Sequence, residues 1–274
     1  MALINREDSI FIAGHNGMVG RAIKKNLELN SYKNLLLPTR KELDLSNQSL
    51  VKNWFNKYKP QVVILAAAKV GGIEANKKYP ADFILENIKI QTNIIENAWK
   101  NNVKRLLFLG SSCIYPKLSP QPIKEEYLLT GPLEITNEPY AIAKIAGIKL
   151  CSSLKRQYNL DAISLMPTNL YGPGDNYHKE DSHVLPALIR RIHQAKVKNK
   201  SEITCWGTGN PKREFLFVDD LAEASIFVLE KVSSTNQIIK SKNKYSDEII
   251  NIGTGSDISI KNLAELIALE LDYK

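Results

Sequence analysis

The sequence is poor in cysteine and histidine, which limits the chemistry it can carry. Its 274 residues hold four histidines and three cysteines, Cys113, Cys151 and Cys205. The odd number and uneven spacing of the cysteines exclude a disulfide framework and a zinc-binding cysteine motif, and they favour a reducing compartment such as the cytoplasm. We expect no bound metal, and we expect Cys151 and Cys205 to be core residues.

Long apolar runs and dense basic clusters are missing as well. No stretch approaches the roughly 18 apolar residues of a membrane-spanning helix, and the short polar segment 1–8 does not look like a signal peptide. Basic residues exceed acidic ones, 37 against 29, for a net charge of +8, but they are not interleaved with aromatics, so nucleic acid is a poor candidate partner. Scattered lysines that keep the chain soluble would explain the excess, and so would a cleft that attracts anions.

What the sequence does contain is a regular alternation of β-prone runs and helical patterns. Strands are expected at 9–13, 34–38, 62–67, 105–109 and 162–167, with helices at 18–29, 46–57, 80–101 and 140–157. This alternation predicts an α/β fold with a Rossmann-type, doubly wound parallel sheet. Right-handed crossovers then bring the carboxyl ends of the strands to one edge, where ligands bind.

The pattern is looser after residue 171. We expect a loop at 172–181, a helix at 183–197, a short strand at 202–206, and then a strand at 215–218 with a helix at 219–231. The polar segment 232–247 is expected to be an exposed loop. A strand at 249–253 and a helix at 259–271 complete the chain.

A glycine-rich turn follows the first strand. Gly14 permits a tight turn, Gly17 lets the backbone approach a pyrophosphate, and Gly20 lets the next helix pack on the sheet. Glycines also serve ordinary turns, but between a strand and a helix this spacing predicts dinucleotide binding. The whole turn reads Gly14, His15, Asn16, Gly17, Met18, Val19 and Gly20.

The end of the second strand indicates which dinucleotide. An NAD site usually has an acidic residue there for the ribose 2′-hydroxyl, but this chain has Thr39 and Arg40. A guanidinium suits a 2′-phosphate, so NADP is favoured, although a plain surface arginine would look the same.

Tyr140 and Lys144 are spaced to share one face of a helix. The ammonium group can lower the pKa of the tyrosine hydroxyl, and that hydroxyl can then protonate a carbonyl oxygen that receives hydride. Ser111, at the carboxyl end of the fourth strand, can hydrogen-bond the same oxygen. A Tyr/Lys pair alone occurs by chance, but together with the serine and the glycine turn it resembles the constellation of short-chain dehydrogenases/reductases.

Longer blocks carry a more specific resemblance. They are 11–20 (FIAGHNGMVG), 65–73 (LAAAKVGGI), 106–118 (LLFLGSSCIYPKL), 136–151, 166–173 and 213–220. The chain closely resembles the GDP-L-fucose synthases, a family of extended short-chain dehydrogenases/reductases. The resemblance implies an NADPH-dependent enzyme that epimerises GDP-4-keto-6-deoxy-D-mannose at C3 and C5 and reduces it at C4 to GDP-L-fucose.

The resemblance also implies roles for individual residues. The reductase triad would be Ser111, Tyr140 and Lys144, and the acid/base pair for epimerisation would be Cys113 and His183. Besides the glycine turn, the cofactor would contact Arg40, Leu109, Gly110, Ser112, Lys144, Pro167, Thr168, Asn169, Leu170 and His183. The GDP-sugar would contact Arg191, Trp206 and Arg213.

Elementary chemistry agrees with these roles. A C4 ketone acidifies the protons on C3 and C5, and the resulting enolate oxygen can be held by Ser111 and Tyr140. A thiol acts as a base only when its pKa is lowered, and we expect a nearby imidazolium of His183 to lower that of Cys113. Taken singly, Cys113 would also fit a buried structural cysteine, and Trp206 would fit ordinary packing. Arginine matches diphosphate oxygens in a bidentate way, but Arg191 and Arg213 would also fit solvated charges.

Two features depart from the family. Asn16 stands where many relatives carry a basic residue, which weakens the expected preference for NADP over NAD. The chain stops at Lys274, where the family usually continues, so we expect an incomplete substrate lobe. Two alternatives stay open: a related GDP-deoxysugar reductase, and a truncated, non-catalytic NADP-binding homologue.

The expected organisation is an NADP-binding Rossmann domain and a smaller lobe. The domain covers 1–170, with 215–231 and 249–254 returning to it, and the substrate lobe covers 171–214 and 232–274. By the same resemblance, we expect a homodimer that associates through the helices at 80–101 and 140–157.

Overall fold

A six-stranded parallel sheet forms the centre of the protein. The computed structural model describes residues 3–179, 181–233 and 249–273. The strand order is β2-β1-β3-β4-β5-β8, and every neighbouring pair is parallel. The strands are β1 (Ile10–Ala13), β2 (Leu35–Leu36), β3 (Val62–Leu65), β4 (Arg105–Leu109), β5 (Ala162–Pro167) and β8 (Ile249–Ile252). The predicted α/β fold with a Rossmann-type sheet is therefore confirmed.

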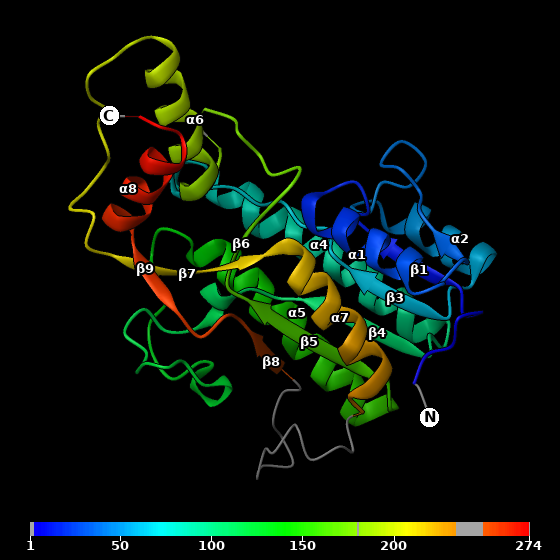
Figure 1. Cartoon of the computed structure of the whole chain (residues 1–274). Coiled ribbons are helices and arrows are strands. Elements are labelled where there is room, and N and C mark those ends of the chain that lie inside the picture. Colours follow the sequence, from blue (N-terminus) through cyan, green and yellow to red (C-terminus); the bar gives the residue numbers. More distant parts are fainter. Residues whose placement is uncertain (1–2, 180, 234–248, 274) are drawn as a thin grey trace.

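Helices cover both faces of this sheet (Figure 1). One face carries α1 (Met18–Leu29) and α7 (Val218–Lys231), and the other carries α2 (Gln48–Tyr58), α4 (Pro80–Lys100) and α5 (Glu138–Tyr158). Strands covered on both faces need apolar side chains at successive positions. Because helices cover both faces, β1, β3, β4 and β5 are buried along their whole length, and most of their side chains are accordingly apolar.

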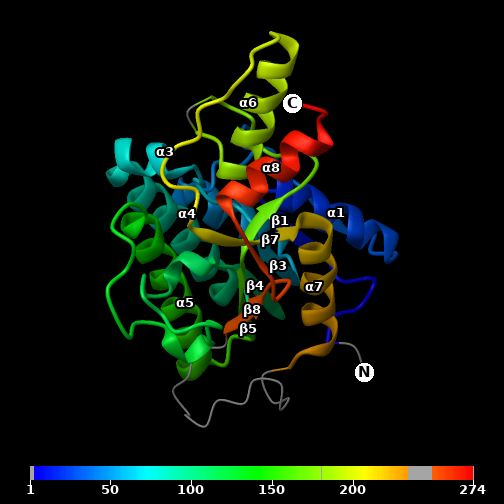
Figure 2. The same ribbon diagram turned by 60° about the vertical axis from the view of Figure 1, so that its left-hand side comes forward.

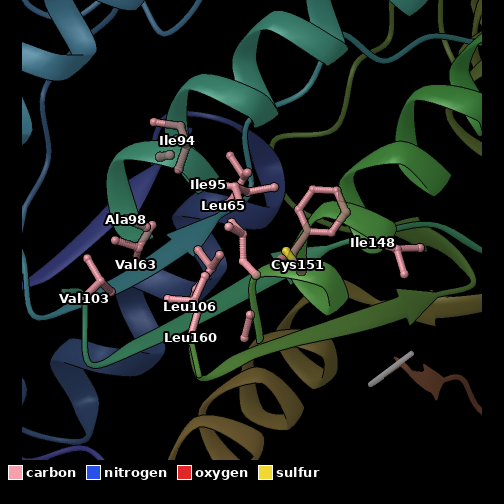
Figure 3. Packing of buried hydrophobic residues seen from close by; sticks show 14 of the residues in the cluster. Val63, Leu65, Ile94, Ile95, Ala98, Val103, Leu106, Ile148, Cys151 and Leu160 are labelled. Atoms are coloured by element: carbon pink, nitrogen blue, oxygen red, sulfur yellow. The ribbon is translucent and has the colours of Figure 1, made fainter. Parts of the chain in front are cut away.

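The packing below β3 and β4 gives the site a rigid base (Figure 3). Val63 and Leu65 of β3 and Leu106 of β4 are fully buried in one cluster with Ile94 and Ile95 of α4. Truncating such a side chain to alanine typically costs about 2–5 kcal/mol. The carboxyl ends of β3 and β4 therefore have little freedom to shift.

A smaller unit lies at one end of the molecule (Figure 2). It contains a three-stranded sheet in the order β6-β7-β9, in which β7 is parallel to β6 and antiparallel to β9. Its elements are β6 (Asn169–Tyr171), β7 (Lys212–Phe217), β9 (Asp257–Ser259), α6 (Val184–Val197) and α8 (Ile260–Glu270). The helices enclose a separate core of Leu188, Ile192, Leu263 and Ile267.

Some local predictions are wrong. Residues 202–206 form no strand. Four of these five residues are exposed, and only Ile203 packs on the core beside α6 and α8, so little apolar surface holds the segment in place. Cys205 is exposed rather than a core residue, whereas Cys151 is buried as predicted. The predicted strand at 34–38 shortens to Leu35–Leu36.

Several short elements were not foreseen. They are β6, β9, α3 (Ile73–Lys78) and two 3₁₀ helices at Ser112–Ile114 and Glu125–Tyr127. Most of the predicted loop at 232–247 lies outside the described residues. Every helix in the described ranges is too short or too polar to cross a membrane.

Candidate active site

The turn between β1 and α1 depends on glycine at two positions. Gly14 has φ of +94°, and a Cβ there would lie 2.8 Å from the backbone nitrogen of Ala67. A Cβ on Gly20 would lie 2.1 Å from the carbonyl oxygen of Gly14. Gly17 donates its N–H to that same oxygen at 3.0 Å. Glycine therefore lets α1 start directly against the sheet edge.

The N-terminus of α1 is open to an anionic ligand. Gly17 is its N-cap, and no described side chain caps it, so the N–H groups of the first turn, which includes Met18 and Val19, remain free for a ligand. His15 is buried in the turn, where burial lowers its pKa below 6.5, and Asn16 is exposed. The pyrophosphate of a dinucleotide fits the positive end of the α1 helix dipole.

The end of β2 carries the residues that would face a ribose phosphate. Arg40 is exposed there. Hydrogen bonds from Ser46 lower the pKa of Asp44, and the charge of Arg40 lowers it further. Glu42 accepts hydrogen bonds from the backbone nitrogen of Thr39 at 2.7 Å and from its hydroxyl at 2.8 Å. The guanidinium thus remains accessible to a 2′-phosphate, which fits NADP.

Ser111 and Cys113 lie directly beyond β4. Ser111 caps the 3₁₀ helix Ser112–Ile114, and its Oγ accepts the N–H of Cys113 at 3.4 Å. Gly110 donates its N–H to Leu165, and a Cβ on Gly110 would lie 2.4 Å from Cε of Met166. The end of β4 is thus pressed against β5, which fixes where the serine and the cysteine emerge.

Lys144 is buried at the base of the site, 4% exposed. Its Nζ donates to the carbonyl oxygen of Leu109 at 2.7 Å, and it lies 5.0 Å from the ring centre of Phe108 and 5.7 Å from that of Tyr140. Burial lowers the pKa of Lys144 from 10.5 to about 8. A Cβ on Gly147, one turn further along α5, would lie 2.6 Å from Phe108, so glycine brings this helix close to β4.

The electrostatics differ from two sequence-based expectations. Burial raises the pKa of Tyr140, and Cys113 acts in the same direction, so the predicted lowering by Lys144 is not found. Burial also raises the pKa of Cys113 to about 11, against the lowering effects of Ser111 and Lys144. The predicted lowering of the Cys113 pKa by His183 is not found among the described residues. The structure nevertheless brings Ser111, Cys113, Tyr140 and Lys144 into one electrostatically coupled group.

His183 stands at the N-cap of α6 and interacts with a partner that sequence reasoning missed. Burial lowers the pKa of His183, and the carboxylate of Asp175 opposes this. Oδ1 of Asp175 accepts the N–H of Asn176 at 2.7 Å, whereas its Oδ2 is buried without a described hydrogen-bond partner. The position of Asp175 in the 172–181 loop, eight residues before His183, was the available signal.

The residues at the end of β5 form the junction with β6. Thr168 donates its N–H to Ile252 at 3.1 Å, and its Oγ1 is buried without a described partner. Asn169 donates its side-chain amide to Glu214 at 2.9 Å. Pro167 ends β5, and Leu170 lies within β6. An unpartnered buried hydroxyl at this edge offers a hydrogen bond to a ligand, which again fits a cofactor.

The predicted substrate residues divide into a pair and a separate arginine. The Arg191 guanidinium of α6 stacks on the Trp206 ring, 4.3 Å from its centre. Trp206 is 66% exposed, so ring surface remains available to a second planar group. Arg213 lies at the exposed start of β7, where its Nη1 donates to the carbonyl of Lys212 at 2.7 Å. Over the described residues, no cluster of side chains suitable for a metal ion occurs.

Comparison with known proteins identifies the family of the chain. A sequence profile of the NAD dependent epimerase/dehydratase family matches residues 10–253. The chain is 55% identical to GDP-L-fucose synthase 1 of Arabidopsis thaliana over 266 residues, 97% of this chain and 79% of that protein. It is 54% identical to GDP-L-fucose synthase of Escherichia coli strain K12 over 265 residues, 97% of this chain and 82% of that protein.

A solved structure shares the fold closely. It is described as a GDP-D-glycero-L-gluco-heptose synthase from Campylobacter jejuni in the presence of NADPH. The similarity has a TM-score of 0.90 at 38% identity and covers 99% of this chain and 87% of that chain.

Proposed function

The chain belongs to the NAD dependent epimerase/dehydratase family, and we propose that within it the chain is an NADP-dependent GDP-L-fucose synthase. It is an oxidoreductase and epimerase that converts GDP-4-keto-6-deoxy-D-mannose into GDP-L-fucose. Relatives with this name are 54% and 55% identical to it, against 38% for the heptose synthase. Another GDP-deoxysugar reductase is therefore not favoured, and neither is a non-catalytic homologue.

One observation carries this proposal. A cysteine thiol lies two residues beyond Ser111 and is electrostatically coupled to Tyr140 and Lys144. A simple ketone reductase needs the serine, the tyrosine and the lysine. The added thiol supplies a proton-transfer group beside the same carbonyl, which is what epimerisation of the neighbouring carbons requires.

We propose that the cofactor lies along the N-terminus of α1. Gly14, Gly17 and Gly20 form its pyrophosphate seat, and Arg40 meets the 2′-phosphate. Lys144, fixed to the carbonyl of Leu109 at 2.7 Å, reaches the nicotinamide ribose. The turn from Leu109 to Ser112 and the junction from Pro167 to Leu170 border the rest, with His183 near the nicotinamide end. Bound NADPH supplies the hydride for C4.

The epimerisations use an acid and a base on opposite faces of the sugar. With the pKa of Cys113 raised to about 11 and that of His183 lowered, neutral pH leaves a protonated thiol and a neutral imidazole. Such a pair has one proton to donate and one site to receive it. Ser111 and Tyr140 hold the C4 oxygen throughout, first as an enolate and then as the alkoxide of the reduced sugar.

The smaller unit is proposed to hold the GDP group. Trp206 offers a ring face to guanine, and Arg191 and Arg213 offer bidentate donors to the diphosphate. We accordingly propose the division given by the sequence, with 1–170, 215–231 and 249–254 as the NADP-binding part. Residues 171–214 and 232–274 then form the substrate lobe.

Product analysis tests the function. The chain is incubated with GDP-4-keto-6-deoxy-D-mannose and NADPH, oxidation is followed by absorbance, and the sugar is identified by NMR. We expect GDP-L-fucose from the unmodified chain. Cys113→Ser should still bind both ligands but yield sugar that is reduced without epimerisation. Cys151→Ala, which removes a thiol 3% exposed in the core below the sheet, serves as the control. GDP-L-fucose formed by Cys113→Ser at the unmodified rate would contradict the assignment.

We also propose a homodimer formed through α4 and α5. These helices pack side by side, and their outer faces expose Leu85 at 53% and Ile142 at 41%. Leu85→Glu should shift the sedimentation coefficient toward that of a monomer. The free thiol of Cys113 fits a reducing compartment, and we propose the cytoplasm.

A further inference from the structure

We infer that Asn76 is a positioning residue for His183, and that it acts through the Gly71–Gly72 turn. This inference rests on the proposed function for its catalytic meaning, but the contacts stand independently. Asn76 belongs to α3, a short helix that the sequence did not predict, and it is 6% exposed.

Asn76 fixes the turn that precedes its own helix. Its Nδ2 donates to the carbonyl oxygens of Gly71 at 2.9 Å and Gly72 at 3.0 Å. Its backbone N–H donates to Gly72 as well, at 3.1 Å. One side-chain amide thus orients two consecutive peptide groups of the loop that leaves β3.

A second asparagine anchors the same loop to α4. Asn87 is 2% exposed; its Oδ1 accepts the N–H of Lys69 at 2.8 Å and its Nδ2 donates to the carbonyl of Lys69 at 3.0 Å. The backbone N–H and the carbonyl oxygen of Lys69 are therefore both hydrogen-bonded to one buried side chain. The loop between β3 and α3 is held at two points, which leaves the glycine turn little freedom.

The glycine turn in turn seats the segment that leads to His183. The N–H of Gly72 donates to the carbonyl oxygen of Asp181 at 3.0 Å. A Cβ on Gly72 would lie 2.5 Å from the carbonyl oxygen of Ser182, and the nearest backbone atoms of that segment would have to move. The φ and ψ angles of Gly72, −67° and −178°, are ordinary for alanine. Glycine is needed here for the close approach and not for the backbone conformation.

His183 follows immediately and is fixed on both sides. Its carbonyl oxygen accepts the N–H of Ala187 at 3.0 Å as the first bond of α6. On the other side, two residues away, Asp181 is bound to Gly72. An acid/base group must lie within about 0.5 Å of its productive position to work efficiently. A series of contacts supplies this constraint. It runs from Asn76 to Gly72 and from Gly72 to Asp181, two residues before His183, and it links the edge of the main sheet to the smaller unit.

Two readouts separate positioning from general stability. The first is deuterium incorporation at C3 and C5 of the keto sugar in D₂O without NADPH, which reports proton transfer alone. The second is the histidine imidazole NMR spectrum, which is simple because the chain has four histidines. His183→Asn identifies the His183 signal, and His193, on the same helix, is the internal reference.

The test variants are Asn76→Ala and Gly72→Ala, with Asn97→Ala as the matched control. Asn97 is 3% exposed, and its Nδ2 donates to the carbonyl of Asn93 at 2.8 Å within α4. It is therefore an equally buried asparagine with a bond inside its own helix. Asn76→Ala removes the bonds that hold the glycine turn, and Gly72→Ala obstructs the approach of that turn to Ser182. The two variants thus disturb different contacts of one turn, so the test remains valid if one of them folds poorly.

We expect both test variants to shift the His183 signal and not that of His193, and to slow deuterium incorporation by about tenfold or more. Asn97→Ala should do neither. In a His183→Asn background, Asn76→Ala should cause no further loss, because both changes remove the same positioned group.

An unchanged His183 signal in both variants would overturn the inference whatever the activity. Equal losses with and without His183 would overturn it too. A failure of the proposed function looks different: the unmodified chain would neither exchange deuterium nor oxidise NADPH, while the NMR comparison would still decide whether Asn76 fixes His183.

Discussion

Replacing Lys144 with methionine should stabilise the protein while it abolishes reduction. The ammonium is 4% exposed, and burial lowers its pKa from 10.5 to about 8. At about 1.4 kcal/mol per pKa unit, the charged lysine destabilises the folded chain by about 3 kcal/mol at pH 7. Losing the 2.7 Å bond to Leu109 costs about 1 kcal/mol, so Lys144→Met should gain about 2 kcal/mol.

The pH dependence has a definite sign. Because the folded pKa is the lower one, the unfolded chain binds more protons between about pH 8 and 10.5. The penalty is therefore complete below pH 8 and disappears as the pH rises through this window. At pH 9.5 it should be about 1.4 kcal/mol, which the lost hydrogen bond nearly cancels. The advantage of Lys144→Met should then be close to zero.

Urea unfolding at pH 7 and pH 9.5 measures both values. Lys52→Met, on the exposed face of α2, controls for the change of lysine to methionine itself. The reasoning is refuted if Lys144→Met is less stable than this control at pH 7. It is also refuted if any advantage is the same at both pH values, since a packing effect would not titrate.

Three further predictions concern the cofactor and the ketone. Tyr140→Phe should retain NADPH binding, seen by fluorescence titration, but slow single-turnover reduction by about 100-fold or more, because the C4 oxygen loses its proton donor; normal turnover would exclude this role. Gly20→Ala places a Cβ 2.1 Å from the Gly14 carbonyl oxygen and should lower the unfolding free energy by about 1–3 kcal/mol. It should also prevent NADPH binding, and thermal unfolding with and without NADPH measures both effects. Arg40→Ala should weaken NADPH binding by about tenfold and leave NADH binding nearly unchanged, because only NADPH carries the 2′-phosphate; equal losses for both would place the 2′-phosphate elsewhere.

The main sheet was predictable because its signals are local. Helix α1 begins at Met18 and ends at Leu29, as the glycine turn and the apolar spacing predicted, and β4 and β5 have their predicted bounds. The segment 202–206 has similar β-prone residues, but within the described residues it is not one of the paired strands. Strand formation there depended on a partner, which the local sequence does not encode.

The proximity of Ser111, Tyr140 and Lys144 was predictable from the sequence, but their proton affinities were not. Sequence spacing brought Ser111, Tyr140 and Lys144 together because each position is tied to the end of a strand or the face of a helix. Proton affinities depend on burial by the whole fold, and here burial outweighs the local charges at Tyr140 and Cys113. The roles of Asn76 and Asp175 likewise follow from contacts with segments distant in the sequence.

The reacting groups and the residues that place them make opposite contributions to stability. Cys113 and Lys144 are held in surroundings that disfavour their charged forms, with pKa values near 11 and 8, so the lysine stays charged at neutral pH only at a cost to folding. Gly20 and Gly72 permit close backbone approaches of 2.1 Å and 2.5 Å to a would-be Cβ, and any side chain there would force the elements apart. Substitutions at reacting groups should therefore remove activity and spare or raise stability, whereas substitutions at these glycines should remove both. The buried cluster beneath β3 and β4 contributes stability that offsets the cost of the buried lysine.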